Sequence, residues 1–164
     1  MKLIVAFSKN LGIGYKNKLP WHFKKDLKYF KKITVGNNNN AVIMGKNTFK
    51  SLPNGLLKKR TNLVLSSSLK GENIFNSLQE LNIHLKKKKY DDIWVIGGQQ
   101  IYNLFLENNS IEYIYTTEFA KNYNCDTFFP NIKNINFKEI YSSNINSENN
   151  IEFYHKIYKN NNFY

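Results

Sequence analysis

Hydrophobic residues along this chain gather in short runs that are separated by polar segments rich in Gly, Lys and Asn. The run at 2–8, KLIVAFS, is nearly continuous, which is typical of a strand buried on both faces. Similar runs predict strands over 41–44, 61–65, 74–75, 91–96 and 111–117. Further on, the segments 137–141 and 151–158 alternate apolar and polar residues, as the strands of an antiparallel hairpin do.

A helical repeat is clearest between Pro20 and Thr34, PWHFKKDLKYFKKIT. Its apolar positions, beginning at Phe23, recur at helical spacing, and lysines cover the opposite side. Asp26 breaks the pattern because it lies four residues before Phe30 and therefore falls on the apolar stripe. A buried carboxylate is costly unless a partner binds it. The alternative is a first-turn acid that the helix dipole stabilises.

Three further helices are expected: one beginning at Lys46, one capped by Ser77 and running to His84, and one over 99–106. The order of elements predicts an α/β fold in a single domain, residues 1–164. Its central sheet has about eight mostly parallel strands, helices on both faces and an antiparallel C-terminal hairpin. Segment 10–18 is interpreted as a flexible loop, 37–40 as either a loop or a low-complexity insert, and 159–164 as a frayed tail.

Candidate chemistry follows several of these strands. In such sheets ligands bind at the carboxyl ends of the strands, so Asp26, Gly45, Ser66 and Gly97 are expected to line one edge. At the strand–glycine–helix junctions, backbone N–H groups can face an anion. Ser66 to Ser68 either bind phosphate or cap a turn. The pattern favours an anionic dinucleotide beside a ligand with a cationic or amidine-like head and a carboxylate tail.

The distribution of basic residues draws attention to one position, Arg60. The chain carries a net charge of +12, and only Arg60 among its 24 basic residues is an arginine. An anionic partner is one interpretation, but general abundance of Lys, Asn and Ile explains most lysines equally well. Arg60 stands apart because its planar fork suits a carboxylate or phosphate better than lysine does.

The cysteine content and the lengths of the apolar runs indicate the cellular compartment. One cysteine, Cys125, permits no intramolecular disulfide and favours a reducing, cytoplasmic setting. No apolar run reaches the length of a membrane span, and the N-terminus is interpreted as a strand and not a signal peptide. The scattered His22, His84 and His155 are interpreted as surface or packing residues, with no metal site expected.

Five segments then occur in an order that resembles the dihydrofolate reductase family: LGIGYKNKLPWHFKKDLKYF at 11–30, AVIMGKNTF at 41–49, RTNLVLSSS at 60–68, WVIGGQQIY at 94–102 and CDTFFP at 125–130. The resemblance implies reduction of 7,8-dihydrofolate to tetrahydrofolate, supplying one-carbon metabolism and thymidylate synthesis. The cofactor would be NADPH, whose nicotinamide C4 gives hydride to pterin C6 while N5 gains a proton. It also implies antifolate inhibitors as ligands, a monomer, and an adenosine-binding subdomain at roughly 40–90.

The resemblance assigns roles to individual residues. Asp26 would bind N3 and the 2-amino group of the pterin, Thr117 would support it through a hydroxyl and water, and Trp21 would lie on a lid at 9–23. We expect burial to raise the pKa of Asp26. The other substrate-binding residues would be Ile4, Val5, Leu27, Phe30, Leu52, Leu57, Arg60 for the glutamate α-carboxylate, and Ile96.

The implied cofactor-binding residues form three groups. Those at the nicotinamide and its ribose would be Ala6, Ile13, Gly14 and Leu19. Those at the phosphates would be Gly45, Lys46, Asn47, Thr48, Ser66, Ser67, Gln100 and Thr127. Those at a usually cis glycine pair and the following helix would be Gly97, Gly98, Gln99 and Ile101. Lys46 and Gln100 stand where arginine is common in the family, which weakens the expected grip on a 2′-phosphate.

Three alternatives compete with this interpretation. A related reductase of pyrimidine or riboflavin synthesis would give no reason for Asp26 and Arg60 together. An RNA-binding protein would need exposed aromatic residues beside its lysines, whereas most aromatic residues here follow core periodicity. A fused reductase–thymidylate synthase would need a second domain beyond residue 164.

Overall fold

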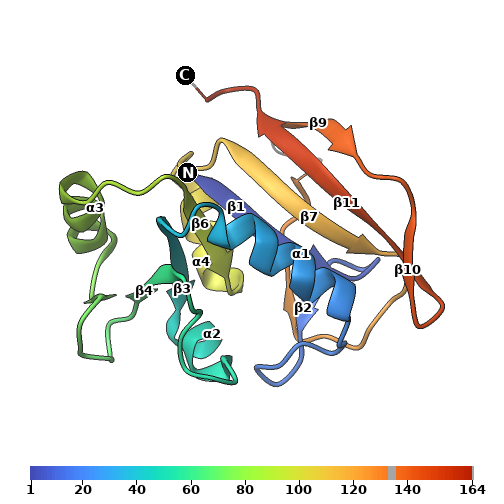
Figure 1. Cartoon of the computed structure of the whole chain (residues 1–164), viewed down its shortest axis with the longest axis horizontal. Helices are drawn as coiled ribbons and strands as arrows, with labels where there is room; N and C mark the ends of the chain where they lie inside the picture. The colour runs from blue at the N-terminus through green and yellow to red at the C-terminus, as the bar shows by residue number, and fades with distance from the viewer. Residues whose placement is uncertain (133–135, 164) are drawn as a thin grey trace.

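The computed structural model describes residues 1–132 and 136–163. Within these residues, nine strands form one sheet in the order β10-β11-β7-β1-β6-β3-β4-β5, with β9 paired to β11 (Figure 1). Strands β1 to β7 of this sheet run parallel, whereas β11 is antiparallel to β7, β9 and β10. The predicted α/β class with an antiparallel C-terminal part is therefore confirmed. The sheet strands are β1 (Lys2–Phe7), β3 (Asn40–Gly45), β4 (Arg60–Leu65), β5 (Ile74–Phe75), β6 (Ile93–Gly97), β7 (Tyr113–Phe119), β9 (Phe137–Ser142), β10 (Asn146–Glu148) and β11 (Ile151–Asn160).

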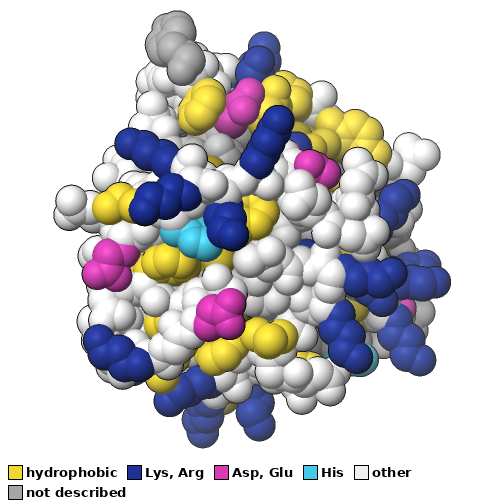
Figure 2. Space-filling view, turned by 60° about the vertical axis from the view of Figure 1, so that its left-hand side comes forward, with side chains coloured by type: hydrophobic (Ala, Val, Ile, Leu, Met, Phe, Trp, Pro, Cys, Tyr) yellow, Lys and Arg dark blue, Asp and Glu magenta, His cyan; other side chains and the backbone are white. Residues whose placement is uncertain are grey.

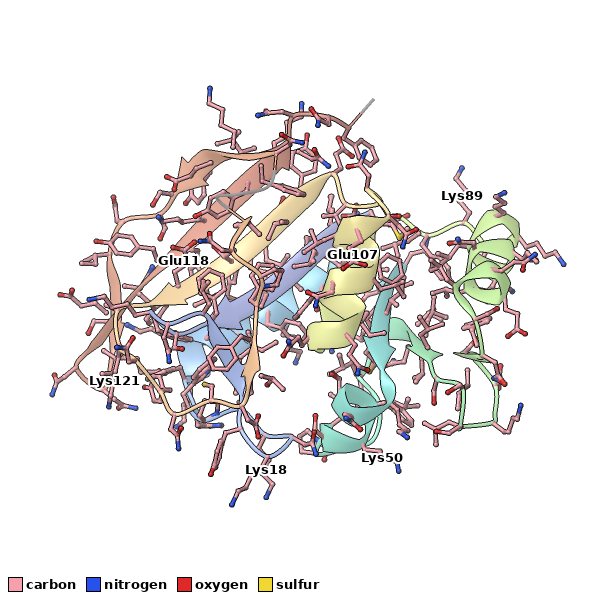
Figure 3. The ribbon with its side chains drawn as sticks, turned by 180° about the vertical axis from the view of Figure 1, so that it is seen from behind. Lys18, Lys50, Lys89, Glu107, Glu118 and Lys121 are labelled. Atoms are coloured by element: carbon pink, nitrogen blue, oxygen red, sulfur yellow. The ribbon has the colours of Figure 1, made fainter. Side chains whose placement is uncertain are left out.

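Helices cover the sheet on both sides. Helix α1 (Lys24–Val35) crosses one face in Figure 1, and α4 (Gln99–Glu107) crosses the other in Figure 3. The alternation of β1 divides the core accordingly. Leu3 and Val5 pack into the cluster that contains Tyr102 and Phe105 of α4, and Ile4 packs into the cluster on the α1 side. The other helices are α2 (Lys46–Ser51) and α3 (Leu78–Lys87). No helix in the described residues is long and apolar enough to cross a membrane.

Helix α1 begins later than the sequence pattern predicts. It starts at Lys24, and the preceding Phe23 is extended, with φ −119° and ψ 117°. Phe23 belongs to a separate aromatic cluster, where its ring lies 4.8 Å from Phe119 and 6.4 Å from Phe153 between ring centres. Packing of Phe23 against two strands therefore overrides the helical periodicity of Pro20 to Phe23.

Two segments that were expected to lack regular structure are ordered. In the 10–18 loop, β2 (Gly12–Gly14) pairs antiparallel with β8 (Thr127–Phe128). At the other end of the chain, β11 continues through Asn160, whose side-chain amide donates to Asn109 Oδ1 at 2.7 Å and to the Ile111 carbonyl at 3.0 Å. The prediction of a frayed tail from residue 159 is therefore wrong for Lys159 and Asn160, and Tyr164 lies outside the described residues.

The end of the asparagine run is also not a loop. Asn40 opens β3 and is only 2% exposed. Its amide nitrogen donates to the Thr34 carbonyl at 3.0 Å, and its amide oxygen accepts from the Asp92 N–H at 3.0 Å. The amide thus satisfies two backbone groups that burial would otherwise leave without partners.

Candidate active site

The carboxylate of Asp26 is the centre of the site. It lies in the first turn of α1 and is only 7% exposed. Burial raises its pKa from 3.8 to about 6, a hydrogen bond with the Thr117 side chain lowers it, and the charge of Glu148 raises it. The expectation that burial raises this pKa is confirmed. Thr117 reaches Asp26 from β7, where it is 2% exposed and paired with Ala6 of β1.

An apolar cluster on the α1 side of the sheet contains five of the residues predicted to bind substrate. They pack with Val42, Met44, Val64 and Trp94, and they are Ile4, Phe30, Leu52, Leu57 and Ile96. Leu27, in contrast, is 42% exposed. Val5 points its side chain to the α4 side, so only its backbone is available on the Asp26 face. The face that leads from Asp26 along α1 is therefore mostly apolar.

Arg60 is held at the far end of the same helix. Its Nη1 donates to Thr34 Oγ1 at 2.9 Å, its Nε donates to the Lys58 carbonyl at 3.0 Å, and its guanidinium lies 5.9 Å from the centre of the Phe30 ring. Asp26 and Thr34 are separated by eight helical residues, or about 12 Å along the axis. An anionic group and a cationic fork thus stand at the two ends of one apolar surface.

Glycines keep the backbone bare at the carboxyl ends of β3 and β6. The peptide between Gly97 and Gly98 is cis, as expected. A Cβ on Gly45 would lie 3.0 Å from Ile101 Cγ1, and one on Gly98 would lie 3.4 Å from Thr48 Oγ1. Because Gly98 is also the N-cap of α4 and supplies no side-chain hydrogen bond, the first turn of α4 keeps its N–H donors.

Polar side chains next to these glycines complete a donor set for an anion. Lys46 Nζ donates to Ser68 Oγ at 3.0 Å, which brings its charge beside the end of β4. Ser66 Oγ accepts from the N–H groups of Ser68 and Leu69, so it caps a turn, one of its two expected roles. Asn47, Ser67 and Gln100 are exposed nearby on the same connections. Cationic, hydroxyl and backbone donors around bare glycines fit the phosphates of a dinucleotide.

The glycine loop before α1 lies at the same end of the molecule as α2, where Figure 3 labels Lys18 and Lys50. Gly14 faces Thr127 in the β2–β8 pair, and Gln99 Oε1 accepts from the Phe128 N–H at 2.9 Å. Ile13 packs against the core cluster on the α4 side, Ala6 packs on the aromatic cluster of Phe23, and Leu19 is 53% exposed. The loop is therefore joined to the N-terminus of α4 through β8.

Trp21 closes this loop. It is 8% exposed and packs between Phe119 and Tyr123, with ring centres 5.0 and 5.2 Å away. Its indole Nε1 is buried and has no hydrogen-bond partner among the described residues. A buried donor of this kind suits a polar ligand or water, since leaving it unpaired is costly.

The sequence pattern missed two polar residues at the site, Glu148 and His155. Glu148 of β10 accepts from the Lys25 N–H at 3.4 Å, and it is close enough for its charge to influence Asp26. His155 of β11 lies 3.1 Å from Thr117 Oγ1 and stacks on Tyr29. Both come from strands more than 100 residues beyond Asp26, so only the strand register reveals their proximity.

Two hollows in the surface lie away from Asp26. One, of about 380 Å³, is on the α4 side of β7 and β11 and is lined in part by Phe7, Glu118 and Tyr158. The other, of about 320 Å³, adjoins Arg60 in sequence and is lined by Lys28, Lys31, Lys32, Val35, Gly36 and Lys59. Only the second is on α1, where it makes the Arg60 end of the helix strongly basic.

Fold and site together define a class: an α/β oxidoreductase that holds an anionic dinucleotide at the carboxyl edge of its sheet, beside a buried carboxylate. A sequence model of dihydrofolate reductase matches residues 1–160. The chain is 34% identical over 178 aligned residues to the dihydrofolate reductase of Heliothis virescens, covering 97% of this chain and 96% of that protein. It is 35% identical to a viral dihydrofolate reductase of Saimiriine herpesvirus 2 (97% and 84% covered) and 33% identical to the dihydrofolate reductase of Gallus gallus (95% and 94%). The chain belongs to the dihydrofolate reductase family.

Proposed function

We propose that this chain reduces 7,8-dihydrofolate to tetrahydrofolate with NADPH, and that Asp26 and Arg60 bind the two ends of the substrate. The observation that carries the proposal is the placement of a buried carboxylate and the chain's single arginine at opposite ends of one apolar helix face. The spacing suits an elongated ligand with an amidine-like head and a carboxylate tail. Family membership supports both the reaction and the cofactor.

The residues divide the work as follows. Bound NADPH supplies the hydride. The two oxygens of Asp26 accept from N3 and the 2-amino group of the pterin, in a bidentate pair. Thr117 holds Asp26 in place, and the carboxylate polarises the ring so that N5 takes its proton through water. The apolar cluster under α1 excludes other water and strengthens these interactions.

Each remaining group of residues has a proposed place. Arg60 pairs with the glutamate α-carboxylate, and the aromatic ring of the substrate lies between Leu27, Phe30, Leu52 and Leu57. Lys46, Thr48, Ser66 and their neighbours hold the phosphates within a subdomain at roughly 40–90, and the loop at 9–23 closes over the nicotinamide.

We also propose that the protein acts as a monomer in the cytoplasm; its lone cysteine supports a reducing setting. Antifolates would occupy the Asp26 site.

The test is the oxidation of NADPH by dihydrofolate, followed by absorbance, in the wild type, Asp26→Asn and Arg60→Lys. We expect activity in the wild type, a loss of about 100-fold or more in Asp26→Asn at neutral pH, and a higher KM for dihydrofolate in Arg60→Lys with kcat nearly unchanged. Full activity of Asp26→Asn would disprove the role of Asp26. An inactive wild type that instead binds RNA in a salt-sensitive manner would disprove the function.

A further inference from the structure

A chain of three polar side chains runs from Asp26 through Thr117 to His155. We propose that His155 is a positioning residue: its Nδ1–H donates to Thr117 Oγ1 and so fixes that hydroxyl as a donor to the Asp26 carboxylate. The sequence pattern placed His155 among surface or packing residues, whereas the structure places its Nδ1 3.1 Å from the hydroxyl of Thr117, the residue whose side chain interacts with the proposed pterin-binding group. Its importance for catalysis rests on the proposed function of Asp26.

Strand register sets the position of His155. Strand β11 is antiparallel to β7, and His155 lies directly opposite Thr117, so both side chains stand on the same face of the sheet. The distance between His155 Nδ1 and Thr117 Oγ1 is 3.1 Å. Asp26, in the first turn of α1, also interacts with the Thr117 side chain. Thr117 is 2% exposed, so its hydroxyl must find its partners inside the protein.

The plane of the imidazole is fixed by its neighbours. Its ring stacks on Tyr29 with ring centres 3.7 Å apart and an angle of 17°, and Phe153 meets it edge-on at 5.5 Å. The backbone is fixed as well, because the His155 N–H donates to Ser143 Oγ at 3.0 Å and its carbonyl accepts from the Ser143 N–H at 2.8 Å. These contacts fix the plane of the ring, and the hydrogen bond with Thr117 then favours Nδ1 over Cδ2 at the edge that faces Thr117.

The number of available hydrogens determines which group donates in each hydrogen bond between Asp26, Thr117 and His155. The Thr117 hydroxyl has one hydrogen and can donate it to only one neighbour. An ionised Asp26 only accepts, so Thr117 must donate to Asp26, and Nδ1 must then carry the hydrogen of its own bond. A bare Nδ1 would instead draw the hydroxyl hydrogen toward His155, and Asp26 could bond to Thr117 only when protonated. The tautomer of His155 therefore decides which protonation state of Asp26 is stabilised.

Other titratable groups surround this chain. Tyr29 of α1 covers the imidazole, Tyr141 of β9 interacts with Tyr29, and Glu148 of β10 lies near Asp26 beside Lys25. Burial lowers the pKa of His155 and raises that of Tyr29 to about 12, so both are neutral at neutral pH. His155 therefore donates to Thr117 as the neutral Nδ1–H tautomer, and no imidazolium is needed.

The decisive measurement needs neither substrate nor cofactor, and so it separates this proposal from the proposed function. NMR of the ¹⁵N-labelled wild type reports the His155 tautomer, and the ¹³C shift of the Asp26 carboxyl reports its pKa. We expect the Nδ1–H tautomer above the pKa of Asp26. An Nε2–H tautomer there would overturn the proposal, and this result is available even if no variant folds.

Three variants at position 155 complete the test. His155→Phe keeps a ring to stack on Tyr29 but cannot donate, and we expect it to raise the pKa of Asp26 by about half a unit to one unit. His155→Asn places an amide N–H where Nδ1 lies and should restore the wild-type value, whereas His155→Gln should not. His84→Phe, a control whose ring contacts Phe75 and Tyr90, should leave the Asp26 titration unchanged.

The pH dependence of catalysis should change among these variants in the same way as the pKa of Asp26. The apparent pKa in the pH profile of kcat/KM for dihydrofolate should rise in His155→Phe and return in His155→Asn, with the KM for NADPH unchanged. An unchanged or lowered Asp26 pKa in His155→Phe would show that His155 only packs, or that the hydrogen bonds run the other way. Equal Asp26 pKa values in His155→Phe and His155→Asn would overturn the donor role.

Discussion

At the scale of single residues, Asp26 shows a conflict between stability and chemistry. Its folded-state pKa of about 6 lies above the ordinary 3.8, so between these values the folded protein holds the proton more tightly than the unfolded chain does. Stability therefore falls as the pH rises through this window, and the loss is complete above the folded pKa. About two pKa units correspond to roughly 3 kcal/mol at neutral pH.

Replacing this carboxyl should therefore stabilise the protein. We expect Asp26→Asn to raise the free energy of unfolding by roughly 2–3 kcal/mol at about pH 7.5 and to have little effect near pH 4. Urea unfolding at both pH values measures the difference, and Glu72→Gln, at an exposed position, serves as the control. If Asp26→Asn raised the free energy of unfolding equally at both pH values, the cost of burying the Asp26 charge would not be the cause.

Asn40 gives a second residue-level prediction. Its amide binds the Thr34 carbonyl and the Asp92 N–H, and the Thr34 hydroxyl in turn accepts from Arg60. Asn40→Ala should lower the free energy of unfolding by about 2–3 kcal/mol and raise the KM for dihydrofolate, because buried backbone groups lose their partners. Thermal unfolding and steady-state kinetics measure both. Asn37→Ala, at an exposed position of the same run, should change stability by less than about 0.5 kcal/mol.

These residues also mark how far sequence reasoning reaches. Asp26 is recognisable because a charge on an apolar helical stripe is a local anomaly, and Arg60 because it is the only arginine. Asn40 and His155 give no such signal. The role of Asn40 depends on Asp92, and that of His155 on Thr117, and neither pairing can be read from local periodicity.

At the scale of elements, long periodic segments and local caps were predictable. Ser77 caps α3 by accepting from the Glu80 N–H at 3.2 Å, as its position before an apolar repeat predicts. The short strands β2 and β8 were not, since two or three residues show no periodicity. The start of α1 was misplaced because the packing of Phe23 on Phe119 is a tertiary effect.

The β2–β8 pair depends on a glycine that tolerates no side chain. A Cβ at Gly12 would collide with Cys125 Sγ, and it would lie 2.7 Å from Cys125 Cβ and 2.9 Å from Ser8 Oγ. Gly12→Ala should therefore separate the loop from β8, lower the Tm by several degrees and raise the KM for NADPH. Adding Cys125→Gly should restore part of both losses. If Gly12→Ala matched the wild type in Tm and KM, this contact would be irrelevant to the loop.

At the scale of the whole molecule, excess positive charge dominates. The net charge is +12, and the described residues contain three ion pairs, which involve only two lysines. Figure 2 shows basic side chains over most of the visible face, with a group at its right-hand margin, and acidic ones scattered singly. Such a surface repels itself and attracts anions, and salt screens both effects.

Salt should therefore move stability and catalysis in opposite directions. Between about 50 and 200 mM salt we expect the Tm to rise while kcat/KM for dihydrofolate falls several-fold. Changing Lys28, Lys31, Lys32 and Lys59 to Gln should remove most of the salt dependence of kcat/KM, since these lysines line the hollow next to Arg60. The same change at Lys86 to Lys89, at the end of α3, should leave it intact. Equal effects of the two sets would point to net charge alone.

The central place of β1 has a consequence for protein synthesis. This apolar strand is made before its neighbours in the sheet, β6 and β7, which are encoded about ninety and more residues later. At roughly 5–20 residues per second, a ribosome needs about 5 to 20 s to supply the first of them. During that time the nascent chain exposes an apolar segment, KLIVAF, whose neighbouring strands have not yet been made. Slow or stalled translation before residue 94 should therefore increase the demand of this protein for chaperones that bind short apolar segments.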